Sequence, residues 1–151
     1  MELKIEQALQ QGIAAHIEGK FQDAENLYRA ILKSQPVNPD ANHNLGVIAV
    51  SVNKADVALP LFKTAVEANP KIEQFWLSYI DALIKEKQFD NARQVLEQAK
   101  TKCMGEERLN ALEERLALIV QTSKSTLSEQ KTRNKATKRN LKANNPSKQQ
   151  L

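Results

Sequence analysis

The stretch PDANHNLGVIAVSVNKADVALPLFKTAVEANP, residues 39–70, is one copy of a pattern that recurs on both sides of it. Shifting the chain by 34 residues aligns side chains of the same kind. The aligned sets are Ala24, Ala58 and Ala92; Tyr28, Phe62 and Leu96; and Ile31, Ala65 and Ala99. A fixed period of about 20–50 residues is typical of repeat proteins, in which stacked units share one continuous core.

Each copy divides into two segments with helical spacing of apolar residues. In the quoted copy these segments are 41–52 and 55–68, and Pro39 suits a first helical turn because its missing N–H needs no partner there. The next copy gives 73–85 and 89–102. With two more segments in the preceding copy, we predict six helices of about 12–14 residues, paired as antiparallel hairpins. The fold class is therefore all-α, with Pro60 expected to bend its helix or delay its start.

A seventh helix is predicted after the third copy, because residues 106–121 contain the apolar stripe Leu109, Leu112, Leu116 and Ile119. Such a helix would cover the last exposed face of the array. The predicted organisation is a repeat domain, 1–121, followed by a basic polar tail or linker, 122–151. Within the domain we place repeats at about 5–38, 39–72 and 73–105, with the capping helix at 106–121.

The charge of the chain is unevenly distributed. Residues 122–151 contain eight of the 22 bases and one of the 18 acids, which makes that segment about +7. The remaining 14 bases and 17 acids give residues 1–121 a net charge of about −3. A mildly acidic body argues against nucleic-acid binding by the repeats. The tail lacks aromatic residues for base stacking, so we do not expect nucleic acid as its dedicated partner.

Catalytic and metal-binding motifs are not found in the sequence. It has no Gly-rich phosphate loop and no zinc-type pair of histidines, and its only histidines are His16 and His43. Two imidazoles without further ligands make a poor metal site, so we expect no cofactor, no metal and no enzymatic activity. Cys103 is the single cysteine, and the charges of Lys100 and Lys102 could lower its pKa.

The amino terminus lacks the basic and apolar regions of a signal peptide, and no apolar run reaches the length of about 20 residues that spans a bilayer. We therefore expect a soluble cytoplasmic protein without a membrane span.

The repeated residues are similar to the tetratricopeptide repeat. The resemblance is closest in Asn44-Leu45-Gly46, followed by Ala58, Phe62, Ala65 and Pro70, and covers roughly residues 5–104. It implies a solenoid of three helix-turn-helix repeats. The third copy departs from the family by having Ile80 where a small residue is usual. We expect this side chain to push its two helices apart.

In this family the first helix of each repeat lines a concave groove. The resemblance therefore implies a groove lined mainly by apolar residues, in which the two histidines could come near each other. The expected groove residues are Leu9, Ile13, His16, His43, Asn44, Val47, Val50, Leu77, Asp81 and Ile84. The Lys/Asn/Arg clamp with which some members grip chaperone tails is not matched, since apolar residues and Asp81 stand at its positions.

These features predict a non-catalytic module that binds a peptide or helix from another protein in the groove. The alternative occupants are the seventh helix or a second copy of the chain, which would mean self-association. Two other functions stay open. The repeats resemble those that precede glycosyltransferase, sulfotransferase or methyltransferase domains in longer bacterial proteins, and the last residues resemble the opening of a further helix. The chain could then be the recruiting arm of a larger enzyme, or a nucleic-acid or membrane adaptor acting through its tail.

Overall fold

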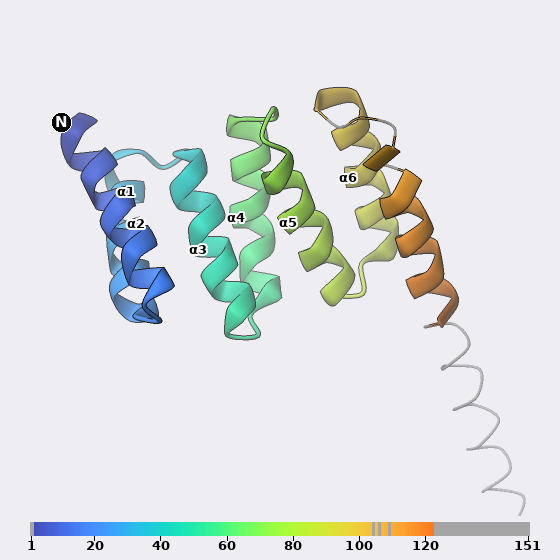
Figure 1. The fold of residues 1–151 in the computed structure, drawn as a ribbon, viewed down its shortest axis with the longest axis horizontal. Helices are drawn as coiled ribbons and strands as arrows, with labels where there is room; N and C mark the ends of the chain where they lie inside the picture. Colours follow the sequence, from blue (N-terminus) through green and yellow to red (C-terminus); the bar gives the residue numbers. More distant parts are fainter. Residues whose placement is uncertain (1, 104, 106, 109, 123–151) are drawn as a thin grey trace, which may run out of the picture. The chain divides into compact units, whose positions relative to one another are not determined.

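The structure, a computed structural model, describes residues 2–103, 105, 107–108 and 110–122, and the side chains from Lys4 onward. The first six helices, α1 to α6, follow one another along the chain, and the described residues contain no strand (Figure 1). Their bounds are α1 Glu2–Ile17, α2 Phe21–Ser34, α3 Pro39–Ser51, α4 Ala55–Ala68, α5 Glu73–Lys85 and α6 Phe89–Lys102. The predicted all-α class and the pairing of helices are confirmed.

The chain divides into two units, Met1–Glu113 and Glu114–Leu151. In the first unit each helix packs against its neighbour in sequence, so that α1 pairs with α2, α3 with α4 and α5 with α6. The helices α1, α3 and α5 lie in front in Figure 1, with α2, α4 and α6 behind them. The first unit is thus a row of three helix pairs, with one face formed by α1, α3 and α5.

A glycine facing an aromatic ring brings the helices of the first two pairs together. A methyl group added at Gly12 would lie 2.5 Å from Cε1 of Tyr28, and one added at Gly46 would lie 2.5 Å from Cε1 of Phe62. Both rings are fully buried. The close approach explains why these helix interiors tolerate glycine, which costs about 1 kcal/mol relative to alanine.

The third pair uses two aliphatic side chains at the equivalent positions. Ile80 and Leu96 are both fully buried, at 1% and 2% exposure. Helices α5 and α6 contact each other less extensively than α3 and α4 do. This difference agrees with the expectation that a side chain at position 80 keeps the pair further apart.

The helix ends follow from local chemistry. Asn38 caps α3, because its Oδ1 accepts a hydrogen bond from the backbone N–H of Ala41 at 2.9 Å, and Pro39 takes the first helical position as predicted. Pro60 does not delay the start of α4, which begins at Ala55 and continues through the proline. Its side chain is exposed, so the proline is accommodated on the surface of the helix.

The predicted seventh helix is present in the described residues 107–108 and 110–122, and it continues from the first unit into the second. In the second unit Leu116 and Val120 are buried, whereas Leu118 is 64% exposed. The predicted tail, apart from Thr122, lies outside the described residues. Among the described helices, none is long and apolar enough to cross a membrane.

Candidate functional site

A groove of about 500 Å³ lies between α3 and α5, and we call it the α3–α5 groove. Its floor is formed by Phe62 and Ala82, both almost fully buried. Phe62 comes from α4, and the other lining residues come from α3, α5 and the turn after α3. Its walls and rim are Val47, Val50, Ser51, Asn53, Ser78, Asp81 and Lys85. An apolar floor with a polar rim is typical of surfaces that bind other molecules.

A hydrogen-bonded cluster beside the groove joins α3 to α5. The His43 ring lies 2.8 Å by Nε2 from the Ser78 hydroxyl and 3.3 Å by Nδ1 from Oδ1 of Asn44. Because the amide oxygen only accepts hydrogen bonds, Nδ1 holds the ring proton and Nε2 accepts from Ser78. Gln74 in turn donates from Nε2 to the Ser78 oxygen at 3.2 Å. The direction of every bond in the cluster is therefore consistent with a neutral His43.

Aromatic rings surround His43 on its other sides. Its ring centre lies 4.7 Å from that of Phe75 and 5.5 Å from that of Phe62. The side chain is only 8% exposed. Burial lowers the pKa of His43 below its ordinary value, and the hydrogen bond to Asn44 and the charge of Asp40 oppose this only in part. His43 thus connects α3, α4 and α5 in its neutral form.

The structure brings some of the predicted groove residues together and separates others. Val47, Val50 and Asp81 line the α3–α5 groove, and His43 and Asn44 belong to the adjoining cluster. Leu77 and Ile84 of α5 are half-buried and do not line it.

The predicted residues of α1 lie apart from the α3–α5 groove. Leu9 is half-buried against the core of the first two pairs, and Ile13 is 40% exposed. The His16 ring meets Phe21 edge-on at 5.5 Å, whereas the ring neighbours of His43 are Phe62 and Phe75. The expected meeting of the two histidines is therefore not seen.

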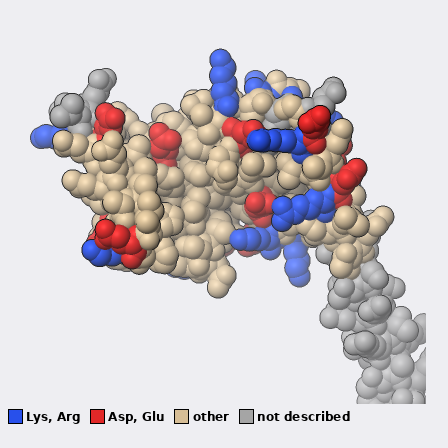
Figure 2. Space-filling view, viewed as in Figure 1, with Lys and Arg blue, Asp and Glu red and all other residues tan. Residues whose placement is uncertain are grey.

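The face formed by α1, α3 and α5 has an uneven distribution of charge. In Figure 2, which shows this face, the surface over α3 is mainly uncharged and most charged side chains lie toward its edges and over the later helices. Helix α3 contains a single charged residue, Asp40 in its first turn. An uncharged strip beside a groove is the part of such a face best suited to apolar contacts.

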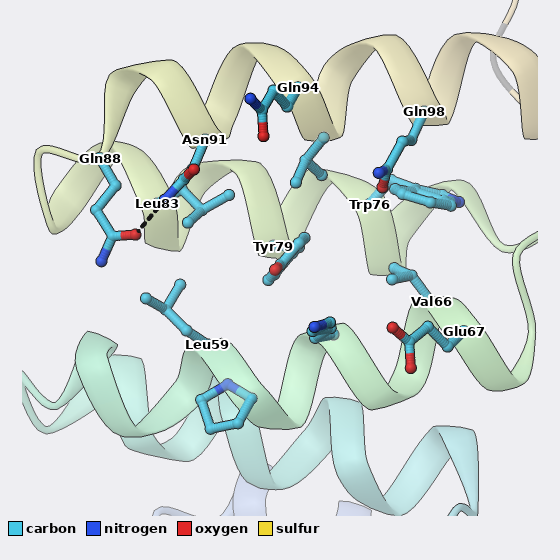
Figure 3. A pocket seen from close by; sticks show the side chains of 13 residues that line it. Leu59, Val66, Glu67, Trp76, Tyr79, Leu83, Gln88, Asn91, Gln94 and Gln98 are labelled. Atoms are coloured by element: carbon cyan, nitrogen blue, oxygen red, sulfur yellow. Dashed lines mark hydrogen bonds between the residues drawn. The ribbon is translucent and has the colours of Figure 1, made fainter.

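A second groove, of about 430 Å³, lies between α4 and α6, and we call it the α4–α6 groove (Figure 3). Helix α5 forms its floor with Trp76, Tyr79 and Leu83. The indole N–H of Trp76 donates to the carbonyl of Pro70 at 2.8 Å. Burial and the carboxylate of Glu67 raise the pKa of Tyr79. This groove was not predicted from the sequence.

Amide side chains form the α6 wall of the α4–α6 groove. Gln88 directly precedes α6; Asn91, Gln94 and Gln98 follow along the helix, and Asn91 donates to Oε1 of Gln88 at 2.8 Å. Their spacing of three or four residues places them on one helical face. Polar residues are usual on an exposed helix face, so this row gave no distinctive signal in the sequence.

Metal-ligating side chains do not cluster in the described residues, and the pKa of the cysteine there is not lowered. No three His, Cys, Asp or Glu side chains among them gather where they could hold a metal ion. Burial and the charge of Glu73 raise the pKa of the Cys103 thiol, contrary to the lowering that Lys100 and Lys102 suggested. The nearby carboxylate was not visible in the sequence, because Glu73 lies at the start of the preceding helix.

The comparison with protein families identifies the chain. Residues 9–51 and 49–116 each match a family model described as a tetratricopeptide repeat. The chain therefore belongs to the tetratricopeptide repeat family, as its repeated residues predicted. Solenoids of this kind typically present extended concave surfaces to binding partners and are scaffolds for protein interaction. No curated protein matches the chain as a relative.

Solved structures share the fold. A mutant of MamA is 26% identical, with a TM-score of 0.62 over 82% of this chain and 68% of that one. The Yersinia enterocolitica type III secretion chaperone SycD, solved with a peptide of the translocator YopD, is 16% identical with a TM-score of 0.63 over 80% of this chain and 92% of that one. The first repeat domain of Spaghetti (RPAP3), bound to an HSP90 peptide, is 18% identical with a TM-score of 0.68 over 81% and 94%.

Proposed function

We propose that this protein binds a peptide segment of another protein in the α3–α5 groove. The observation that supports this most directly is the open groove itself, whose apolar floor and valine wall are surrounded by exposed polar residues. None of the described residues of the first unit fills the groove, and the half-buried Val47 and Val50 leave apolar surface available for contact. Two structures that share the fold were solved with peptides, which agrees with this kind of ligand.

The expected mode of binding follows from the shape and chemistry of the groove. An apolar side chain of the peptide would contact Val47 and Val50, and its flanking polar groups would face the rim. Binding of this kind gains free energy mainly from apolar surface removed from water, at about 25 cal/mol for each Å². The polar rim then determines which peptides are accepted.

The test is a selection from a library of short random peptides displayed on phage, followed by affinity measurements with one synthetic peptide from the selected set. Val47→Glu places a charge on the groove wall, and we expect it to weaken binding at least about tenfold, equivalent to about 1.4 kcal/mol. Val37→Glu is the matched control, because Val37 is 66% exposed in the turn before α3 and lines none of the grooves described here.

Two results would contradict the proposal. One is a library from which no peptide is enriched on the wild-type protein. The other is a selected peptide whose affinity is lowered equally by Val47→Glu and Val37→Glu. Circular dichroism of both variants must match the wild type, so that loss of binding is separated from loss of structure. Sedimentation velocity, measured in parallel, would detect self-association through the same surface.

A further inference from the structure

The face formed by α1, α3 and α5 changes in character from one repeat to the next. Helix α1 has no Asp, Glu, Lys or Arg after Glu6, and its last turn contains His16; α3 has none of these four residue types after Asp40. Helix α5 has Asp81 and Lys85 in its second half, where the first two helices are uncharged. Over the second halves of these helices, the face therefore has no Asp, Glu, Lys or Arg on α1 and α3 but has both signs of charge on α5.

The repeat offset shows that this change occurs at equivalent positions. Ile13 and Val47 precede Asp81 in one row, and Ile17 and Ser51 precede Lys85 in the next. Ile13 is 40% exposed and Ile17 is 82% exposed, so the apolar end of the face is open to contact. Exposed apolar side chains at one end and charged ones at the other give the face a direction.

The two charges at the α5 end are not neutralised by each other. Asp81 and Lys85 are four residues apart on one helix, a spacing at which opposite charges often pair. Neither forms an ion pair with any residue in the described part of the chain. Both side chains are exposed and both line the α3–α5 groove beside Val47 and Val50. They are therefore available to charges on a ligand.

We propose that the bound peptide has an apolar end and an end with one basic and one acidic side chain, and that it binds in a single orientation. The apolar end lies over α1 and α3, the basic group faces Asp81, and the acidic group faces Lys85. This inference rests on the proposed function of the same groove. A peptide with charges of one sign only would place a like charge against either Asp81 or Lys85, and such juxtapositions disfavour binding.

The experiment compares peptides selected from the same phage library on two proteins. One is the wild type, and the other is the double variant Asp81→Lys with Lys85→Asp, which exchanges the two charges and leaves the net charge unchanged. We expect peptides selected on the wild type to have apolar residues at one end and a basic–acidic pair at the other. On the variant, the order of the basic and acidic residues should be reversed.

Affinities of one synthetic peptide make the comparison quantitative. Exchange of the two charges on the protein should lower the affinity for a peptide selected on the wild type about tenfold. Exchange of the two charges on the peptide should then restore most of the lost affinity. The matched control is Asp90→Arg with Arg93→Asp on α6, which also exchanges two exposed opposite charges and should leave affinity unchanged.

The outcomes separate this inference from the proposed function. Suppose that peptides bind and that Val47→Glu lowers their affinity, but that the charge exchange at Asp81 and Lys85 changes neither the affinity nor the selected sequences. The inference is then wrong and the proposed function stands. If no peptide is enriched on the wild type, both are wrong. Equal effects of the exchanges on α5 and α6 would also contradict the inference, because binding would then depend on charge outside the groove.

Discussion

In the first two helix pairs a glycine faces an aromatic ring, whereas Ile80 and Leu96 occupy the equivalent positions of the third. The outer face differs as well, since α1 and α3 are uncharged where α5 has Asp81 and Lys85. The helix order and the 34-residue offset are nevertheless maintained. The fold therefore depends on filling the space within each pair, and not on one set of side chains. The outer positions are free to differ, and the candidate site lies where they do.

The largest expected effect on stability comes from removing the buried ring of Phe62. Phe62→Ala removes a side chain that is 1% exposed and packs with Ala49, Ala58 and Ala82. We expect a loss of about 3–5 kcal/mol in the free energy of unfolding, as for other buried aromatic residues changed to alanine. Urea unfolding followed by circular dichroism measures it. A loss below about 1 kcal/mol would show that the ring does not hold α3 and α4 together.

A smaller effect is expected from adding a methyl group on the glycine side of the same contact. Gly46→Ala places Cβ 2.5 Å from the Phe62 ring. The strain should exceed the gain of about 1 kcal/mol in helix propensity and destabilise the protein by about 1–3 kcal/mol. Gly105→Ala is the control, because a Cβ there meets nothing within 4 Å. If both changes gave the same stability, the close approach would have no energetic importance.

The third pair can be tested by converting it to the pattern of the first two. Ile80→Gly and Leu96→Phe should each destabilise the protein alone, one by leaving a cavity and the other by overpacking. Together they recreate the glycine–aromatic pair, so we expect a favourable coupling of about 1 kcal/mol in a double-mutant cycle. Strictly additive effects would mean that the two side chains do not share one packing site.

Much of the fold could be predicted from the sequence because the repeat offset relates each helix to two others. The segments 55–68 and 89–102 match α4 and α6, and Pro39 marks the start of α3. The residues of the candidate site were harder to predict from the sequence. Leu9 has the spacing of a groove residue, yet it packs against the core of the first two pairs. Exposure at such positions depends on how neighbouring pairs pack, which the offset does not determine.

The same reasoning explains what the sequence did not predict. Ser78 precedes the groove residue Asp81 by one helical turn, but its bond to His43 depends on the separation of α3 and α5. The α4–α6 groove depends likewise on the space between two helices that are not adjacent in the chain. Such distances between repeats arise from the sum of many contacts, so they were visible only in the structure.

The smallest expected effect is a dependence of stability on pH at the junction of the second and third pairs. His43 is buried as a neutral ring between Phe62 and Phe75, and burial lowers its pKa. In the unfolded chain a histidine has a pKa of about 6.5. The unfolded state therefore binds more protons below that pH, and the free energy of unfolding should fall as pH falls from about 6.5 toward the lower pKa of the folded protein.

The measurement compares urea unfolding at neutral pH with unfolding at mildly acidic pH, because carboxylates also contribute to any single curve. His43→Asn removes the titrating ring, so the loss of stability between the two pH values should become smaller, even if the variant is less stable at both. An unaltered pH dependence in His43→Asn would show that the ring accepts a proton in the folded state without cost. The bond from Ser78 to Nε2 would then not hold the second and third pairs together, since a protonated ring cannot accept it.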